Sequence, residues 1–485
     1  MRPGRISCRP VPALMLGLVS ILVSMACVPS GGGGPVPQGA LIITQVPAGA
    51  APATPADRLN PDLRYPPGSR IVVVTDPAHP ERVRVLSQGL PRAGAPALSP
   101  DGRRIVFAGS RTPQLGWTLF EAGVDGRRPV QILRMEGDCI DPAYLAHGRL
   151  IFACAMGHDH ERTWSLYTAS PGGQDVTRIT FGPGSAFDPT PLADGRILFA
   201  MQQNPGPGRP ERTTGLFTMN ADGTMLSPYA GSHDGDPWQV RPRPTADGGV
   251  VFISAGGENP GHLERVEMSR PMATRHRLTE RAVLTAQPVP DGDLLVTTSP
   301  QDAGPATAGL FRFSPGEQTL TPLMSDPDHH LVEALMVFRW EEPPERPSAV
   351  NLAMSTATLV CYDAGRTGEP AGNGSSLPFH LSAEMIDGSH PGNASVVPLG
   401  QVPMAGDGSF HVEVPADRPL RMVAEDTAGK RTISGWFWLR PGEVRSCFGC
   451  HENRESAPPN QVVQALANPA VSLPMKTELA RGETP

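Results

Sequence analysis

A tight turn followed by an alternating apolar strand recurs five times in this chain, and no other feature limits its fold so strongly. The copies read "LSPDGRRIVFAG", "LAHGRLIFAC", "LADGRILFAM", "TADGGVVFIS" and "VPDGDLLVTT". Their turn glycines, at 102, 148, 195, 248 and 292, are 44 to 53 residues apart. That spacing is typical of one four-stranded β-propeller blade per repeat. A second turn half a repeat later, as in "GVDGRRP" and "NADGTM", separates the third and fourth strands of each expected blade.

The repeats predict an all-β protein with a propeller over residues 41–340. We expect six blades, with seven as the alternative, because "RIVVVTDP" and "RVRVLS" supply a less regular first blade. The stretch "HHLVEALMVFRW" is expected to close the ring against "LIITQV" near the beginning of the propeller. Gly and Pro, 53 and 56 of 485 residues, suit turn-rich β-structure.

Beyond the ring, the pattern changes twice. Residues 341–349, around "EEPPERPS", form a proline-rich linker. Residues 350–440 contain alternating strands such as "SFHVEVP", which predict a small antiparallel β-sandwich. Residues 441–485 are irregular and punctuated by proline, and they carry the only closely spaced cysteine pair of the sequence.

That pair belongs to a C-x-x-C-H motif formed by Cys447, Cys450 and His451. Thiols at this spacing add to the two vinyl groups of a haem, and the following imidazole ligates the iron. A zinc ribbon needs a second C-x-x-C pair, and a thioredoxin-like motif needs a βαβ pattern. We therefore predict one covalent haem c on these three residues, with structural zinc or an unmodified dithiol as the alternative.

The beginning of the chain predicts export. Residues 1–26 place three arginines before an apolar run and small residues, the layout of a signal peptide. Cys27 opens a Gly/Pro-rich tether over residues 27–40 and resembles the acylated cysteine of a bacterial lipoprotein. We expect a membrane-anchored lipoprotein on the periplasmic or cell-surface side, with a secreted soluble protein as the alternative.

Two further pairs of residues are candidates for bonding or metal binding. Cys139 and Cys154 face each other if their hairpin turn centres on Ala146 and His147, which favours a disulfide over free thiols or a metal site. His329 and His330 lie where the chain leaves the ring, so either one is a candidate ligand for the haem iron or for an additional metal.

The order of these segments resembles the hydrazine synthase alpha subunit family. The resemblance rests on "FDPTPLADGRILFAM", "DPDHHLVEALMV", "DGSFHVEVPADRPLRMVAEDTAGK" and "LRPGEVRSCFGCHENRESAPPN", of which the last two are the most specific. It implies an exported propeller, a middle β-domain with covalently bound haem, and a zinc ion near that haem. Glu455 stands where the enzyme has a tyrosine associated with the haem iron.

These observations support three functional interpretations. The first is a lipid-anchored monohaem cytochrome that passes electrons to a redox partner protein or performs small-molecule redox chemistry as a haem oxidoreductase. The second is a propeller that binds a partner or ligand, with a structural or sensory haem. The third is a hydrazine synthase-like subunit, which Glu455 makes the least favoured. The net charge of −7 argues against nucleic acid as a partner.

Overall fold

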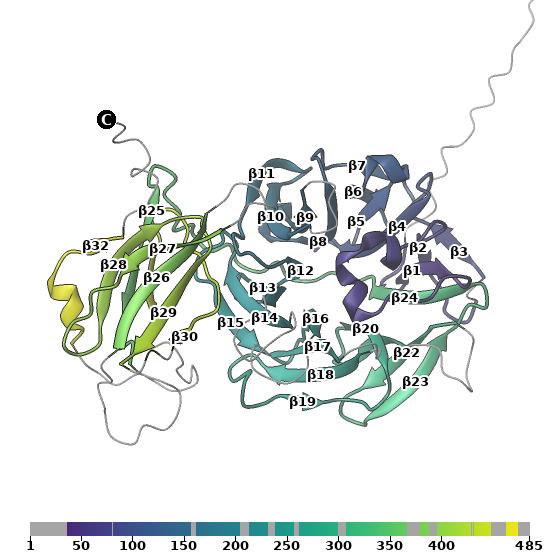
Figure 1. The fold of residues 1–485 in the computed structure, drawn as a ribbon. Helices are drawn as coiled ribbons and strands as arrows, with labels where there is room; N and C mark the ends of the chain where they lie inside the picture. Colours follow the sequence, from purple (N-terminus) through teal and green to yellow (C-terminus); the bar gives the residue numbers. More distant parts are fainter. Residues whose placement is uncertain are drawn as a thin grey trace, which may run out of the picture.

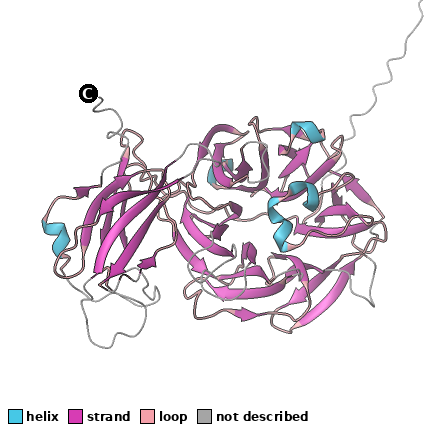
Figure 2. Cartoon of the chain, in the orientation of Figure 1, coloured by secondary structure: helices cyan, strands magenta, loops and turns pink. Residues whose placement is uncertain are grey.

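The computed structural model describes residues 36–79, 81–156, 162–203, 213–230, 238–256, 261–298, 307–365, 379–387, 395–427, 429, 431–447 and 462–473. Strands in this part of the chain form eight four-stranded sheets. Six sheets make a ring and two make a sandwich beside it (Figure 1). Helical segments are few and short (Figure 2). They are η1 (Pro55–Leu59), α1 (Pro61–Arg64), η2 (Pro113–Leu115), η3 (Ala146–Gly148) and η5 (Gln464–Ala467).

The ring is the expected six-bladed propeller. Its blades are numbered I to VI in chain order, and the strands of each blade are given from the innermost strand outward. Blade I is β24 (His329–Met336), β1 (Leu41–Pro47), β2 (Arg70–Val74) and β3 (Val83–Val85). Blade II is β4 (Arg92–Leu98), β5 (Arg104–Ser110), β6 (Thr118–Gly123) and β7 (Val130–Gln131). Blade III is β8 (Asp138–Tyr144), β9 (Leu150–Ala155), β10 (Trp164–Ser170) and β11 (Gln174–Arg178).

The other three blades follow the same order. Blade IV is β12 (Ala186–Pro191), β13 (Arg196–Gln203), β14 (Thr213–Asn220) and β15 (Ser227–Ala230). Blade V is β16 (Trp238–Pro244), β17 (Gly249–Ala255), β18 (His262–Glu267) and β19 (His276–Arg277). Blade VI is β20 (Val283–Pro288), β21 (Leu294–Thr298), β22 (Gly309–Ser314) and β23 (Thr319–Met324).

Blade I closes the ring as the sequence predicts. Its innermost strand, β24, comes from the end of the propeller sequence and pairs antiparallel with β1 from the beginning, with Leu41 opposite Met336. Neighbouring blades pack face to face through buried aliphatic and aromatic side chains. These side chains form nearly continuous cores between the sheets. Closure therefore pairs strands from the beginning and the end of the propeller sequence in one blade, and the sheet edges that remain are the short outermost strands of the blades.

The sandwich contains the strands predicted between residues 350 and 440 and two more. One sheet has the order β31 (Val444–Cys447), β25 (Thr356–Cys361), β28 (Phe410–Pro415) and β32 (Val471–Ser472). The other has the order β27 (Ser395–Gln401), β26 (Phe379–Asp387), β29 (Leu420–Asp426) and β30 (Arg431–Ile433). β31 and β32 pair in parallel at the two edges, so the segment after residue 440 completes the first sheet.

The chain between the ring and the sandwich lies along the rim of the propeller. Glu342 accepts a hydrogen bond from the backbone N–H of His147 at 2.9 Å, and Glu345 pairs with Arg149 at 3.2 Å. Further on, Trp438 is fully buried and donates from Nε1 to the carbonyl of Gly223 in blade IV at 3.2 Å. The predicted linker is thus a docked segment. None of the described helices is long and apolar enough to cross a bilayer.

Candidate functional site

The first residue of the C-x-x-C-H motif ends an edge strand of the sandwich. Cys447 is the last residue of β31, opposite Cys361 of β25 in the parallel register. Its sulfur is half-buried against the sandwich core, 3.6 Å from the carbonyl oxygen of Val360. Cys450 and His451 lie outside the described residues, as does Cys27. The motif therefore begins at the last residue of a well-formed edge strand.

A buried carboxylate fixes this edge strand to the propeller. Glu443 accepts two hydrogen bonds on Oε1 from Arg445, at 2.9 Å from Nε and 2.7 Å from Nη2. The same oxygen accepts from the backbone N–H of Met225 in blade IV at 2.9 Å, and Oε2 accepts from that of Arg440 at 2.8 Å. Arg445 and Glu443 are 8% and 2% exposed. Because charge-assisted hydrogen bonds to a buried carboxylate are strong, Cys447 has a set position relative to blade IV.

The two histidines named from the sequence serve ring closure in this structure. His329 Nδ1 lies 3.0 Å from an oxygen of Asp326. His330 accepts on Nδ1 from the backbone N–H of Ala308 at 2.9 Å, which leaves Nε2 to donate to the carbonyl of Ala48 at 3.3 Å. Burial lowers the pKa of His330, and hydrogen bonding to backbone groups opposes this shift. Among the described residues, no group of three or more His, Cys, Asp or Glu side chains is arranged to hold a metal.

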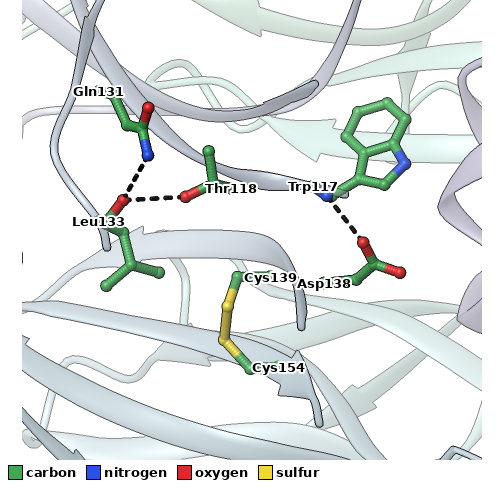
Figure 3. Close-up of a disulfide and its surroundings, with 7 residues drawn as sticks. All are labelled: Trp117, Thr118, Gln131, Leu133, Asp138, Cys139 and Cys154. Atoms are coloured by element: carbon green, nitrogen blue, oxygen red, sulfur yellow. Dashed lines mark hydrogen bonds between the residues drawn. A yellow bond between two sulfur atoms is a disulfide. The ribbon is translucent and has the colours of Figure 1, made fainter. Parts of the chain in front are cut away.

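Cys139 and Cys154 are joined by a disulfide between β8 and β9 of blade III (Figure 3). The register places the two residues directly opposite each other, with Cα atoms 4.2 Å apart. The residue before Cys139, Asp138, accepts a hydrogen bond from the backbone N–H of Trp117 at 2.7 Å, which ties this hairpin to blade II. The disulfide thus joins the two inner strands of blade III, next to the hydrogen bond that ties this hairpin to blade II.

The centre of the ring holds a second polar site, built around a short plug. This plug consists of η1 and α1, which Figure 1 shows in purple over the central part of the ring. η1 begins with proline after a Thr54–Asp57 capping box, and the Asn60 side chain accepts from the first backbone N–H groups of α1. Good caps allow so short a segment to form two helical turns. They direct Arg58 and Arg64 into the ring, where both are 3% exposed.

Each plug arginine pairs with an aspartate from an innermost strand. Arg58 forms a close two-point ion pair with Asp188 of β12, and its Nη2 also lies 3.5 Å from Asp141 of β8. Arg64 is bidentate to Asp141, at 2.6 and 3.1 Å. The positive charge of Arg58 lowers the pKa of Asp188 against the opposing effect of burial. Both aspartates are buried, so the pairs replace the water that would otherwise fill the channel.

Glu333 of β24 connects the plug to the closing strand. It accepts hydrogen bonds from the hydroxyls of Tyr65 at 2.5 Å and Thr44 at 2.9 Å. It also accepts from the backbone N–H of Ala95 at 2.9 Å and from Arg241 at 3.0 Å. Burial would raise the pKa of this carboxyl, but Arg241 and the other donors lower it to about 2. Glu333 therefore links blade I, blade II, blade V and the plug.

Sequence reasoning did not single out these channel residues, although the repeats contain a signal for them. The position seven residues before the turn glycine is occupied in blades II to V by Ala95, Asp141, Asp188 and Arg241. All four have positive φ, between 51° and 55°, and lie at bulges in the innermost strands. A bulge re-aims a side chain. In blades II to V, this repeat position therefore directs one residue toward the channel. The type of residue at that position sets the charge there.

A cavity of about 320 Å³ adjoins this network. Its charged lining residues include Arg58, Arg241, Arg243, Asp188 and Glu333. The rest of the lining is mostly proline and apolar side chains from the innermost strands and from the segment that leaves β24. The cavity is large enough to hold a small organic molecule.

Comparison with known proteins gives a family match for part of the sandwich and a structural match for most of the chain. The family described as hydrazine synthase alpha subunit middle domain matches residues 386–452. Hydrazine synthase of Kuenenia stuttgartiensis has a similar structure, with a TM-score of 0.75 at 20% identity over 89% of this chain and 71% of that chain. No curated protein sequence matches.

Two further solved structures match this chain more weakly. TolB from Acinetobacter baumannii has a TM-score of 0.45 at 13% identity, over 62% of this chain and 66% of that chain. A puromycin hydrolase has a TM-score of 0.38 at 17% identity, over 70% and 53%. Residues 386–452 therefore match the hydrazine synthase alpha subunit middle domain, and the chain as a whole shares the propeller-plus-sandwich fold of hydrazine synthase.

Proposed function

We propose that this protein is an exported monohaem c-type cytochrome that transfers electrons or performs small-molecule redox chemistry at the haem. Cys447 and Cys450 attach the haem through thioether bonds, and His451 is an axial ligand. The observation that carries the proposal is the position of the C-x-x-C-H motif inside residues 386–452, the segment that matches the hydrazine synthase alpha middle domain.

The described part of the motif fits such an attachment. Cys447 lies on an edge strand of the sandwich and is only partly buried. The neighbouring Cys361 is fully buried in the sandwich core. Two thiols and an imidazole are the donor set that haem c requires. Structural zinc at the same motif would need further protein ligands.

Bound haem c would supply one-electron redox chemistry and, with an open iron coordination position, a binding site for small nitrogen or oxygen species. The chain's own contribution is positioning. The Glu443–Arg445 pair and the Met225 backbone hold β31 against blade IV. The attached group would therefore sit at a set place beside the propeller, where a partner subunit or redox partner protein can recognise both surfaces together.

The proposed location is outside the cytoplasm, with Cys27 lipidated at the membrane surface. The Cys139–Cys154 disulfide supports this proposal, because disulfides persist in oxidising compartments. Cells that produce the protein are labelled with a fatty-acid analogue, which tests whether Cys27 carries a lipid anchor. Wild-type protein is expected to carry the label and Cys27→Ser protein to lack it, whereas label on both would remove the anchor from the proposal.

Haem attachment is tested by producing the full chain with a haem c maturation system and measuring its intact mass. We expect one porphyrin per chain in the wild type and none in the Cys447→Ala/Cys450→Ala variant. Cys361→Ala is the matched control, since it removes a cysteine from the adjacent strand and should keep the haem. Bare polypeptide from wild-type cells would refute the proposal.

The absorption spectrum then separates the two redox roles. A low-spin reduced protein that does not bind carbon monoxide is a dedicated electron carrier. A high-spin iron that binds carbon monoxide has an open position and supports small-molecule chemistry.

The family match favours one second candidate, a subunit of a hydrazine-forming complex. Purification of the complex from the native organism through a tag on this chain, followed by an assay for hydrazine, tests it. Co-purifying subunits with hydrazine production would support this candidate, and a complex without that activity would eliminate it.

A further inference from the structure

We propose that the central cavity of the propeller binds a small organic carboxylate, with Arg243 and Arg58 as the residues that recognise its charge. This site lies in the ring and does not involve the haem motif. It goes beyond the redox function proposed above and does not depend on it.

The charges of the channel network do not balance. Four arginines gather at the closed end of the channel, Arg58, Arg64, Arg241 and Arg243, against the three carboxylates Asp141, Asp188 and Glu333. Arg58, Arg64 and Arg241 each form ion pairs with these carboxylates. In their ordinary ionisation states the seven groups leave one positive charge. A charge in a low-dielectric site is costly unless it is paired, so one monoanion would complete the cluster.

The unbalanced positive charge lies on Arg243. Arg243 donates from Nε to the side-chain oxygen of Gln287 at 3.1 Å and from Nη1 to the carbonyl of Pro242 at 2.8 Å. Both acceptors are neutral, and within the described chain Arg243 has no carboxylate partner. Burial lowers the pKa of Arg243, and the neighbouring Asp188 opposes this shift. Arg243 is therefore the guanidinium that lacks a counterion.

Beside the cavity, one buried hydrogen-bond donor lacks an acceptor among the described residues. Arg58 lines the cavity and is 3% exposed, yet its Nη1 has no hydrogen-bond partner among the described residues. Buried polar atoms almost always have a partner, and an unsatisfied one indicates an unseen water, ion or ligand. A carboxylate has two oxygens, which suit donors from two guanidinium groups.

The walls of the cavity define the rest of the ligand. Toward the blade turns they are apolar or aromatic, with Leu98, Tyr144, Val289 and Trp340 among them. Trp340 is held there by its indole N–H, which donates to the carbonyl of Leu98 at 3.2 Å. A polar end and apolar walls are typical of sites for small organic molecules. The ligand class is thus a monocarboxylate with an apolar or aromatic body.

Access is from one end of the channel. The plug covers the end where β4 begins, because Asp62 of α1 pairs with Arg92 at 2.5 Å. The cavity reaches the opposite end of the same strand at Leu98, and its lining residue Ala246 is exposed at a blade turn. A ligand would enter from the turn side, beside the segment that leads to the sandwich, and meet the arginines at the closed end.

Isothermal titration of the full mature chain with 3-phenylpropionate, and in parallel with its uncharged amide, tests the proposal. We expect saturable binding of one carboxylate per chain, and an affinity for the amide at least tenfold lower. No saturable binding of the acid, or equal binding of acid and amide, would overturn it. Titration with the Cys447→Ala/Cys450→Ala protein should give the same affinity, so a failure of the haem proposal leaves this result intact.

Variants then locate the site. Arg243→Gln should lower the affinity at least tenfold, while Arg243→Lys, which keeps the charge, should retain more of it. Arg312→Gln is the matched control, because Arg312 lies in β22 of blade VI, is paired with Asp293 at 2.5 Å and does not line the cavity. Equal effects of Arg243→Gln and Arg312→Gln would place binding elsewhere.

A second variant tests the apolar end and covers the case in which Arg243→Gln fails to fold. Trp340→Ala should weaken binding of 3-phenylpropionate and leave that of acetate unchanged, since acetate does not reach the aromatic wall. Equal weakening of both ligands, or of neither, would contradict the assigned orientation.

Discussion

The propeller and the sandwich hold their centres together in opposite ways. The sandwich is filled by buried apolar side chains from both sheets, with Phe410, Val412 and Val414 on one face of β28. The propeller has similar apolar layers between its blades, but its axis is filled by buried arginines and carboxylates. Two sheets packed face to face can exclude water with apolar residues alone, whereas six inner strands leave a central channel.

This contrast shows that the two parts depend on different forces. In the core of the sandwich, stability scales with buried apolar area. In the propeller, the plug brings two charges into the channel, and each must find a partner. The propeller should therefore respond to pH and to single charge removals, and the sandwich should respond to cavity-forming substitutions.

Removal of Glu333 should have the largest effect. Glu333→Ala leaves Arg241 and the Tyr65 hydroxyl without their acceptor, at a cost of about 3–5 kcal/mol. Hydrogen exchange should rise in β1 and β24 and stay unchanged in β26 and β28. Phe410→Ala is the mirror variant, with a similar loss of about 3–5 kcal/mol confined to the sandwich. Equal exchange in both domains for either variant would show that they unfold as one unit.

Acid should destabilise the propeller first. The pKa of Glu333 is lowered from 4.5 to about 2 in the folded protein. Its stabilisation is therefore complete above pH 4.5 and is lost as the pH falls toward 2, a change on the order of 3 kcal/mol. The urea midpoint of the propeller transition should fall across that range. The fall should be smaller in Glu333→Gln, and an unchanged slope would assign the effect to other groups.

Reduction of the disulfide should cost somewhat less. Cys139 and Cys154 are 15 residues apart, a loop for which cross-linking contributes about 2–3 kcal/mol. Urea unfolding of Cys139→Ala/Cys154→Ala protein, or of wild type with a reductant, should show this loss in the propeller transition. The double variant should no longer respond to reductant, and a remaining response would point to another cysteine.

Loss of the Arg149–Glu345 ion pair at the rim of the propeller should have the smallest effect on stability. Arg149→Gln removes the partially exposed bridge to Glu345 in the segment that leads to the sandwich, and exposed pairs contribute at most about 1 kcal/mol. The unfolding midpoint should hardly move, while hydrogen exchange of residues 341–347 should increase. A larger loss of stability would mean that this segment couples the ring to the sandwich.

The cysteine pair illustrates how far local reasoning reaches. A turn centred on Ala146 and His147 predicts Cys139 opposite Cys154. In the structure the pairs next to the turn are Tyr144 with Leu150 and Ala143 with Ile151, a register that would bring Cys139 opposite Ala155. A bulge between Ile140 and Ala143 shifts the register by one residue and brings the cysteines together. The predicted pair and the observed pair agree, but the bulge is the reason.

The two candidate sites also differ in how far neighbouring residues predict them. The C-x-x-C-H motif was predictable because three neighbouring residues carry its chemistry. The channel was not, because its residues come from η1, β8, β12, β16 and β24, separated by up to 275 residues between Arg58 and Glu333. Only the repeat position seven residues before each turn glycine hinted at it.

The order of residues alone was enough to specify six blades, the closing strand and the sandwich, because turn glycines and the alternation of apolar residues act over a few neighbours; the C-x-x-C-H spacing predicts haem in the same local way. Which side chains meet in the channel, and that Arg243 lacks a counterion there, was decided by ring closure. A buried charge is balanced by the groups that surround it in the folded protein. Those groups come together only when the first and last strands of the ring pair.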